Sequence, residues 1–348
     1  MTFAVAGVTG NTGRVVAETL LAAGQPVRVI VRDREKAASF VARGAEVAVA
    51  DLSDRDALTN ALVGTRAAYL LVPTEYGPAP GYVRRTRAFI EAIVAAVVDA
   101  RPGHTVVLSS IGANMHSGTG PIKYLHELEE ALRTRASTPV TALRAAYFIE
   151  NFAQALPMLG EGVLQTFLPA GLEVPMASTA DIGRQAAALM LEAPPRAFAT
   201  VEIARDAVTP NDIARAFASL LGRAITVRAA PLEALVPAMT SMGIHEELAE
   251  HYREMTQALI TQSFEPDASA RRVASTTPIE TVLTGLLHAD HVFASTGDSR
   301  VLAIDKDTGE AVTVGDVPGE LPWRVAVDET HVYWTFADSG DVWSAPKP

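Results

Sequence analysis

The chain has 348 residues, of which 49% are hydrophobic and 20% are charged, so it can bury a core of two or more layers. It contains no cysteine, which excludes disulfides, thiolate catalysis, cysteine-ligated zinc and iron–sulfur clusters. Its net charge is −11 and it has no apolar run of about 18 residues, so we expect neither a nucleic-acid partner nor a membrane span. An apolar strand begins near Met1 and leaves no room for a signal peptide, which favours a cytoplasmic protein.

Apolar runs of strand length alternate with helix-length runs near the start of the chain. The predicted strands are Phe3–Ala6, Val27–Val31, Val47–Ala50, Ala67–Val72 and Thr105–Ser109. The predicted helices between them are Arg14–Ala23, Arg34–Arg43, Ser53–Leu62 and Tyr82–Asp99, and Ser53-x-x-Asp56 resembles a helix-capping box. Continuous apolar strands separated by helices are typical of a parallel sheet covered on both faces. The sequence therefore predicts an α/β fold with a doubly wound parallel sheet of the Rossmann type.

The alternation weakens after residue 145. The predicted helices of this part are Asp181–Glu192, Asn211–Leu221, Leu232–Met242 and Glu246–Ile260, joined by turns that contain proline and glycine. We therefore expect a dinucleotide-binding domain (1–150), a smaller, mostly helical substrate-side region of the same unit (151–286), and a separate tail (287–348).

The tail differs in composition and contains an internal repeat. His291-Val292-Phe293 recurs forty residues later as His331-Val332-Tyr333, and the three tryptophans of the chain all lie in this segment. A period near 40 with short strands resembles β-propeller blades, although two copies cannot close a ring of about four to eight blades. The tail is therefore predicted to be a short all-β appendage. It is either a fused remnant with local structure alone or a patch for homo-oligomer formation.

The strongest motif lies between the first strand and the first helix. Its residues are Gly7-Val8-Thr9-Gly10-Asn11-Thr12-Gly13. In a dinucleotide fingerprint, Gly7 permits the tight turn, Gly10 lets the backbone approach the pyrophosphate, and Gly13 lets the helix pack closely on the strand. The spacing is G-x-x-G-x-x-G, and a simple strand–turn–helix corner could carry the same glycines. The position in a βαβ unit favours a dinucleotide site.

The end of the second strand distinguishes the two nicotinamide dinucleotides. Arg32 stands first outside the strand, where an NADP site places an arginine for the 2′-phosphate, and Arg34 is either a second contact or a solvated charge. Asp33 could instead bind the ribose of NAD. We therefore expect NADP(H), with NAD as the alternative.

Two later strand ends are predicted to complete the cofactor site. Asp51 and Leu52 follow the third strand, beside the adenine. Val72, Pro73 and Thr74 end the fourth strand, beside the nicotinamide ribose. Ordinary loop residues are the alternative in both places.

These and further segments together resemble the NmrA-like atypical short-chain dehydrogenases/reductases. The matching segments are GVTGNTG (7–13), VRDREKA (31–37), ADLSD (50–54), LLVPT (70–74), LSSIGAN (108–114), LRAAYFIEN (143–151) and ADIG (180–183). The resemblance covers roughly residues 2–286. It implies hydride transfer from NAD(P)H to a small planar electrophile such as a quinone. Some members bind the dinucleotide without turning it over, so a regulatory NAD(P)-sensing protein is the alternative function.

The catalytic pair that is usual in short-chain reductases is missing. Tyr124 is present, but Leu128 occupies the position of the lysine in Tyr-x-x-x-Lys. Alignment on Glu130 places His126 at the lysine position, which resembles the quinone-reductase branch of the family. There hydride can pass directly to the acceptor, and catalysis depends on proximity and orientation. Our catalytic candidates are His126, Ser110 and Tyr124.

The acceptor is predicted to lie at the ends of the fifth strand and of the segment near residue 147. The candidate substrate contacts are Ser109, Tyr147, Phe148 and Asn151, since flat aromatic side chains suit a planar molecule. Core packing is the alternative for the last three. No metal motif is present, because there is no His-Glu-x-x-His, and His245 and His251 are six residues apart. We therefore expect a small-molecule acceptor and no metal.

Overall fold

The computed structural model describes residues 1–262, 264 and 267–289, and beyond them only the backbone of six short strands. The chain divides into two compact units. The first contains Met1–Arg215 and Ala224–Ile279, and the second contains Ala216–Arg223 and Glu280–Pro348.

The first unit is built on an eight-stranded sheet in the order β13-β10-β6-β5-β4-β1-β2-β3. Its strands are β1 (Phe3–Ala6), β2 (Val27–Val31), β3 (Glu46–Val49), β4 (Ala67–Leu70), β5 (Thr105–Ser110), β6 (Val140–Ala145), β10 (Phe198–Ala204) and β13 (Arg271–Ala274). Every neighbouring pair is parallel. The six strands β3-β2-β1-β4-β5-β6 have the order of a doubly wound dinucleotide fold, which confirms the predicted fold class.

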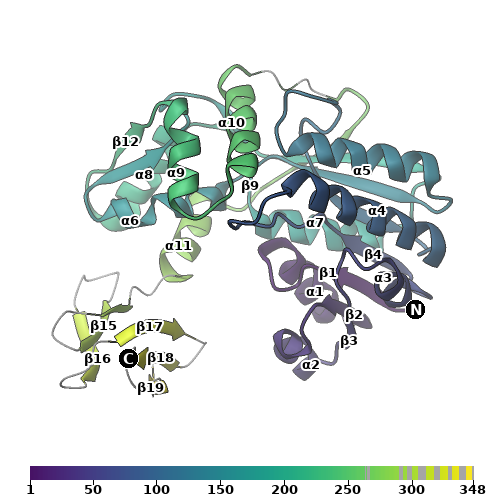
Figure 1. Ribbon diagram of the computed structural model, residues 1–348, viewed down its shortest axis with the longest axis horizontal. Helices are drawn as coiled ribbons and strands as arrows, with labels where there is room; N and C mark the ends of the chain where they lie inside the picture. The colour runs from purple at the N-terminus through teal and green to yellow at the C-terminus, as the bar shows by residue number, and fades with distance from the viewer. Residues whose placement is uncertain are drawn as a thin grey trace. The chain divides into compact units, whose positions relative to one another are not determined.

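The side chains of successive strand residues point into two separate hydrophobic cores, one on each face of the sheet. Phe3 and Val5 pack with α1 (Asn11–Ala22), α2 (Ala38–Ala42) and α7 (Thr179–Leu191) on one face. Ala4 and Ala6 pack with α3 (Arg55–Leu62), α4 (Tyr82–Ala100) and α5 (Ile122–Arg135) on the other face, where α4 and α5 lie side by side (Figure 1). Each fully buried Leu, Val or Phe stabilises the fold by about 1.5–3 kcal/mol. The sheet is therefore held from both faces, as the mainly apolar strands of the first part of the chain predict.

The start of α3 corrects the predicted capping box. The helix begins at Arg55, and the carboxylate of Asp54, not Ser53, accepts the amide of Ala57 at 3.0 Å. Ser53 does not cap the helix, because its amide and hydroxyl both donate to Asp51, at 2.8 and 2.7 Å. Asp54 directly precedes the helix and is charged, so it is the better N-cap.

The segment after β6 contains the predicted helices and additional strands. Besides α7, its helical elements are η2 (Ile149–Ala155), α6 (Leu156–Leu159), α8 (Pro210–Leu221), η3 (Leu232–Ala234), α9 (Leu235–Ser241) and α10 (Glu246–Ile260). A further 3₁₀ turn, η1 (Arg34–Ala37), lies earlier, between β2 and α2. The helix predicted over 232–242 is a 3₁₀ turn, η3, followed by α9. Its small strands are β7 (Tyr147–Phe148), β8 (Val163–Thr166), β9 (Val174–Ala177), β11 (Ala207–Val208) and β12 (Thr226–Ala229). The sequence did not predict that β10 and β13 extend the main sheet.

The second unit contains the end of α8, all of α11 (Ile279–Ala289) but its first residue, and two antiparallel sheets. One is β14-β15-β16 (Phe293–Ser295, Arg300–Ile304, Ala311–Asp316), and the other is β17-β18-β19 (Pro322–Val327, His331–Phe336, Val342–Pro346). Within the described strands each sheet has three members rather than the four of a propeller blade, so the blade resemblance stays a prediction. None of the described helices combines the length and the apolar character needed to cross a bilayer.

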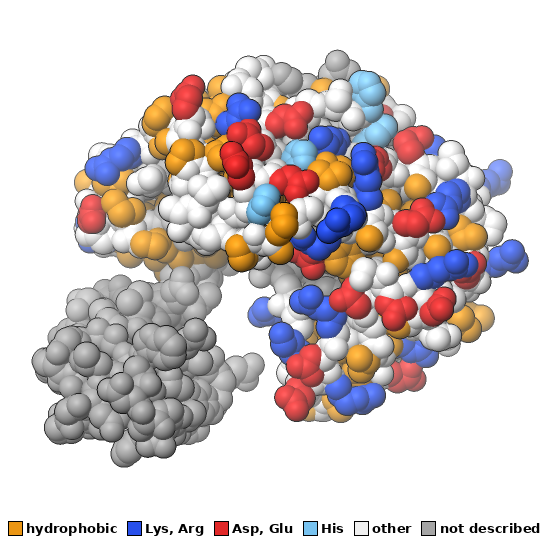
Figure 2. All heavy atoms as spheres, viewed as in Figure 1, with side chains coloured by type: hydrophobic (Ala, Val, Ile, Leu, Met, Phe, Trp, Pro, Cys, Tyr) orange, Lys and Arg blue, Asp and Glu red, His pale blue; other side chains and the backbone are white. Residues whose placement is uncertain are grey.

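Surface charge contributes little to the stability of this fold. Basic and acidic side chains are interspersed over the coloured face in Figure 2. Several form exposed ion pairs, such as Arg55–Asp99 at 2.6 Å and Arg135–Glu91 at 2.7 Å. Exposed pairs are typically worth about 0–1 kcal/mol. The two cores, rather than these pairs, therefore stabilise the first unit.

A buried histidine predicts how stability depends on pH. His104 begins the β5 region and is 3% exposed, with Nε2 hydrogen-bonded to Thr141 Oγ1 at 2.9 Å. Burial lowers its pKa to about 4. The unfolded chain takes up this proton near pH 6.5, so between about pH 6.5 and 4 the unfolded state binds more protons and stability falls as the pH falls. We expect this group alone to lower the free energy of unfolding by up to about 3 kcal/mol across that window.

Urea denaturation at a series of pH values measures the effect. His104→Gln keeps a polar group of similar reach and should flatten this part of the pH dependence. His116→Gln, at an exposed histidine, should leave it unchanged. Parallel pH curves for wild type and His104→Gln would contradict the assignment.

Candidate functional site

The loops after β1 to β5 meet at one edge of the main sheet. Parallel strands place their carboxyl ends together, and in such sheets ligands bind where the strand order reverses. In this sheet the reversal lies between β1 and β4, because β2 and β3 continue on one side and β5 and β6 on the other. The loop after β1 therefore lies at the centre of the candidate site.

The glycine loop has the geometry that its spacing predicts. Gly7 has a φ of +68°, and a Cβ added there would lie 2.6 Å from Leu71 Cδ2. A Cβ on Gly13 would lie 2.4 Å from Gly7 O and 2.5 Å from Ala6 O, so α1 approaches β1 backbone to backbone. Gly10 is the N-cap of α1 and no side chain caps this end. The first amides of α1 are therefore left for an anion.

The side chains of the loop divide into exposed and buried members. Thr9, Gly10 and Asn11 are exposed. Thr12 is 6% exposed, and its Oγ1 accepts the hydroxyl of Tyr69 at 3.0 Å. Thr12 thus ties the loop to the core beneath β4 and offers a ligand only its backbone.

Three charged residues follow β2, and only Asp33 among them has a side chain bonded to another described residue. Arg32 is exposed, and no hydrogen bond or ion pair within the described part of the chain engages its guanidinium. The Asp33 carboxylate accepts the amide of Glu35 at 3.0 Å and so caps η1. Arg34 is exposed on η1. Both arginines are therefore free to bind an anion, and Arg32 is the one that directly follows the strand.

Asp51, after β3, lies within the electrostatic reach of Arg32. Partial burial opposes ionisation of Asp51, but the hydrogen bonds from Ser53 and the charge of Arg32 outweigh it and lower the Asp51 pKa. Leu52 and Val72 are half-buried and pack against the core of α3, α4 and α5. Pro73 is half-buried, and Thr74 is exposed at the end of this strand–loop segment. The predicted cofactor residues therefore occupy successive strand ends along one edge.

The β5 end and α5 bring two catalytic candidates to one connection. Ser110 donates to the Ile111 carbonyl at 3.0 Å, and His126 Nδ1 donates to the Ala113 carbonyl at 2.9 Å. Both side chains are half-buried. Because a carbonyl only accepts, His126 carries a proton on Nδ1 and leaves Nε2 for another partner.

Ser109 belongs to a buried ionic network. Its hydroxyl donates to Glu129 Oε1 at 2.5 Å, and Arg144 donates to both oxygens of Glu129, at 2.9 and 2.6 Å. Arg144 also bonds Asp267 at 2.7 Å. Ser109 therefore joins β5 to α5 and β6, and its hydroxyl is already engaged.

Tyr124 points into the core, away from the side of α5 that carries His126. It is 2% exposed, packs edge-on against Tyr82, and its hydroxyl is hydrogen-bonded to His251 Nε2 at 3.0 Å. Burial raises the Tyr124 pKa to about 12. At 100° per residue, Tyr124 and His126 are about 200° apart around α5. The structure therefore does not bring Tyr124 together with Ser110 and His126.

The other three predicted acceptor residues lie on β7 and η2. The Tyr147 hydroxyl is hydrogen-bonded to Asn151, and burial raises the Tyr147 pKa to about 12. Its ring meets Phe152 edge-on with 6.1 Å between ring centroids. Phe148 packs against the core of α1 and α7. Tyr147 and Asn151 thus form a half-buried polar pair, while Phe148 has mainly a packing role.

Sequence reasoning missed three aromatic side chains near these strand ends. Tyr76 lies on the connection from β4 to α4, Tyr252 lies on α10, and the Phe264 ring lies against Gly112, where an added Cβ would be 2.3 Å from Cδ1. They come from segments far apart in the chain, and no local motif marks them.

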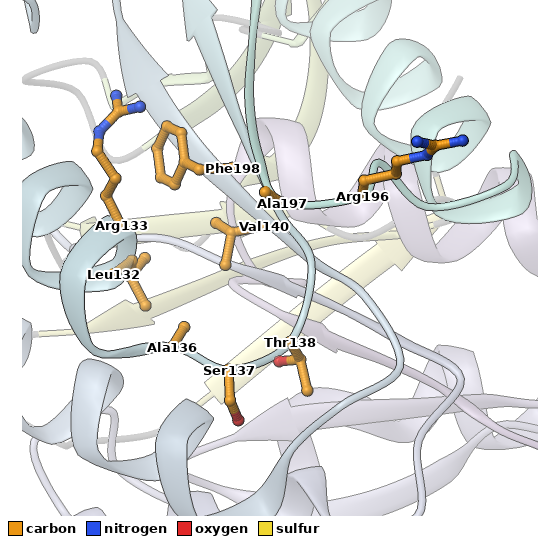
Figure 3. A pocket seen from close by; sticks show the side chains of 9 residues that line it. All are labelled: Leu132, Arg133, Ala136, Ser137, Thr138, Val140, Arg196, Ala197 and Phe198. Carbon is orange, nitrogen blue, oxygen red and sulfur yellow. The ribbon is translucent and has the colours of Figure 1, made fainter.

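One pocket of the first unit lies at the opposite edge of the sheet. It is lined by Leu132, Arg133, Ala136, Ser137, Thr138, Val140, Arg196, Ala197 and Phe198 (Figure 3). The Arg133 guanidinium lies 4.0 Å from the centroid of the Phe198 ring. Val140 and Phe198 are the first residues of β6 and β10, so this pocket is at the amino edge and is separate from the candidate site. Among the described residues, no group of three or more His, Asp or Glu is placed to hold a metal.

The chain is similar to known proteins over most of its length. The model of the NmrA-like family matches residues 1–280. An NAD(P)H azoreductase of Xenophilus azovorans is 28% identical over 255 residues, which are 72% of this chain and 85% of the relative. Quinone oxidoreductase 2 of Escherichia coli is 26% identical over 253 residues, 71% of this chain and 84% of the relative.

The fold is also shared with a solved reductase. The crystal structure of the NADPH-dependent quinone oxidoreductase QOR2 of Escherichia coli with NADPH has a TM-score of 0.68 and 24% identity. The match covers 82% of this chain and 100% of that chain.

Proposed function

Because this chain belongs to the NmrA-like family, we propose that it is an NAD(P)H-dependent reductase that transfers hydride to a small planar acceptor such as a quinone. The observation that carries the proposal is the glycine loop at the strand-order reversal, with an uncapped helix start and the free Arg32 beside it. The names of the azoreductase and quinone-oxidoreductase relatives support it. Both names describe enzymes, so the regulatory alternative gains no support.

The residues present fit a bound dinucleotide. The first amides of α1, those of Asn11, Thr12 and Gly13, would bind the pyrophosphate, and Arg32 would bind the 2′-phosphate of NADP(H). Asp51 and Leu52 would border the adenine, and Val72, Pro73 and Thr74 the nicotinamide ribose. The close backbone contact between Gly13 and the end of β1, which leaves no room for a Cβ, supports this assignment because it brings the start of α1 against the strand end.

The dinucleotide supplies hydride when bound, and the chain supplies position and protons. Ser110 lies half-buried at the end of β5 and would hydrogen-bond the acceptor after releasing the Ile111 carbonyl. His126, fixed through Nδ1, would give a proton from Nε2 to the reduced acceptor when both ring nitrogens carry one, and would be left neutral with its proton on Nδ1. Tyr147 and Asn151 would line the acceptor pocket. NADPH and NADH oxidation measured with a panel of quinones, azo dyes and triphenylmethane dyes tests this function, and inactivity with all of them would overturn it.

Arg32 should determine whether the protein binds NADPH more tightly than NADH. An arginine fork bonds a phosphate through two donors, and such charged hydrogen bonds are worth about 1.5–3 kcal/mol. Arg32→Ala should therefore weaken NADPH binding by that amount and leave NADH binding nearly unchanged, as measured by titration calorimetry. Arg34→Ala, two residues away, serves as the matched control and should cost less. An equal loss for both dinucleotides, or tighter wild-type binding of NADH, would contradict the assignment.

A further inference from the structure

Helix α10 is fastened to the connection between β4 and α4. The Glu247 carboxylate accepts the amides of Gly81, Tyr82 and Val83 at 2.9, 2.8 and 3.3 Å. The His245 amide, just before the helix, donates to the Gly77 carbonyl at 2.8 Å. Glu247 thereby caps α4 from a distant part of the chain. The connection that follows Thr74 is held in place by α10.

Two phenols meet within this fastened region. The hydroxyls of Tyr76 and Tyr252 are hydrogen-bonded, and their ring centroids are 6.0 Å apart with an interplanar angle of 38°. The Tyr252 hydroxyl is also hydrogen-bonded to Thr74. A phenol has one proton and can also accept, so Tyr252 can donate to Tyr76 while it accepts from Thr74. If Thr74 donates to Tyr252 and Tyr252 donates to Tyr76, the Tyr76 hydroxyl keeps its own proton for an outside acceptor.

The exposure of Tyr76 is unusual for a ring that is held in this way. Tyr76 is 60% exposed, whereas Tyr252 is half-buried. Tyr147 is close enough to Tyr76 for the two phenols to interact electrostatically. A held, exposed aromatic ring therefore lies near Tyr147 and is hydrogen-bonded to the phenol that Thr74 contacts.

Resting on the proposed function, we propose that Tyr76 and Tyr252 recognise the carbonyl oxygen of the acceptor. The Tyr76 ring offers a face to a planar molecule, and its hydroxyl donates a hydrogen bond to the oxygen. Tyr252 and Thr74 hold that hydroxyl in position. The site therefore favours quinones over planar cationic dyes that have no carbonyl oxygen, because only a quinone can accept this bond.

Three tyrosine-to-phenylalanine variants test the proposal. Tyr76→Phe and Tyr252→Phe remove the two hydroxyls and keep the rings. Tyr82→Phe is the matched control, since Tyr82 is 4% exposed and its hydroxyl is hydrogen-bonded to Thr86 within α4. For each protein, kcat and KM are measured with NADPH and either a quinone or a cationic triphenylmethane dye. The dissociation constant of the quinone from cofactor-free protein is measured by equilibrium dialysis.

Tyr76→Phe should raise the KM and the dissociation constant of the quinone about fivefold, the value of one neutral hydrogen bond, and leave the dye kinetics unchanged. Tyr252→Phe should act in the same direction, and Tyr82→Phe should change neither. Equal effects on quinone and dye, or no effect on the quinone, would overturn the proposal. If no acceptor oxidises NADPH, the proposed function fails. Dialysis then still decides this inference, because an unchanged quinone dissociation constant in Tyr76→Phe contradicts it and a fivefold loss supports it.

Discussion

Replacing Gly13 with alanine should destabilise the first unit and remove its dinucleotide affinity together. The added Cβ would lie 2.4 Å from Gly7 O and 2.5 Å from Ala6 O, both backbone atoms that cannot move without displacing β1 from α1. Overpacking of this kind costs about 1–3 kcal/mol. The displaced helix start would also lose its alignment with the loop, so we expect NADPH binding to fall more than a hundredfold. Thermal unfolding and titration calorimetry measure the two effects.

Gly10→Ala should lower the affinity for NADPH without lowering the stability of the first unit. The nearest atom to a Cβ on Gly10 is Gly7 O at 3.4 Å, and the φ of Gly10 is −104°, which any residue adopts. This variant should keep wild-type stability and lose NADPH affinity by about tenfold or more, because its methyl group would occupy the approach of the pyrophosphate. Wild-type stability in Gly13→Ala, or wild-type affinity in Gly10→Ala, would contradict the assigned roles of these glycines.

Breaking the Arg144–Glu129 pair should have the largest effect on stability. The side chains of Arg144 and Glu129 are 3% and 1% exposed, and their closest atoms are 2.6 Å apart. Arg144→Leu would leave the Glu129 carboxylate buried without its partner, and such single removals cost about 3–5 kcal/mol. Urea denaturation should show this loss. The combined Arg144→Leu, Glu129→Leu variant should cost less, since no unpaired charge remains at that pair.

The exposed pair Arg135–Glu91 is the matched control. It also has two short bonds, at 2.7 and 2.9 Å, but its side chains are 42% and 66% exposed. Arg135→Leu should therefore cost less than about 1 kcal/mol. If Arg135→Leu and Arg144→Leu lowered the free energy of unfolding by similar amounts, burial would not determine how much the Arg144 network stabilises the protein.

Local signals predicted the part of the site that is built from neighbouring residues. The apolar run Phe3–Ala6 ends at Gly7, and the helix begins within the same motif, so strand, turn and helix could be placed to within a few residues. Arg32 was equally accessible to prediction, because it is the first polar residue after an apolar strand. In both places the sequence order and the spatial order are the same.

Features that join distant segments could not be predicted in this way. Ser109 reads as a free strand-end hydroxyl, but it is bonded to Glu129 on α5. Tyr76 and Tyr252 meet where Glu247 and His245 hold α10 against the segment that leads into α4. β13 escaped prediction because an edge strand is largely exposed and needs no apolar run; two of its four residues, Arg271 and Arg272, are arginines.

Hydride transfer is tested most directly with NADPH that carries deuterium at C4. The purified protein is mixed anaerobically with this NADPH and a quinone. It should oxidise the dinucleotide in step with the loss of quinone. In single-turnover measurements the rate of oxidation should be slower than with unlabelled NADPH. Arg32→Ala should need more NADPH to reach the same rate. NADPH that binds tightly but stays unoxidised with every quinone, azo dye and triphenylmethane dye would contradict the assignment of this chain as a reductase.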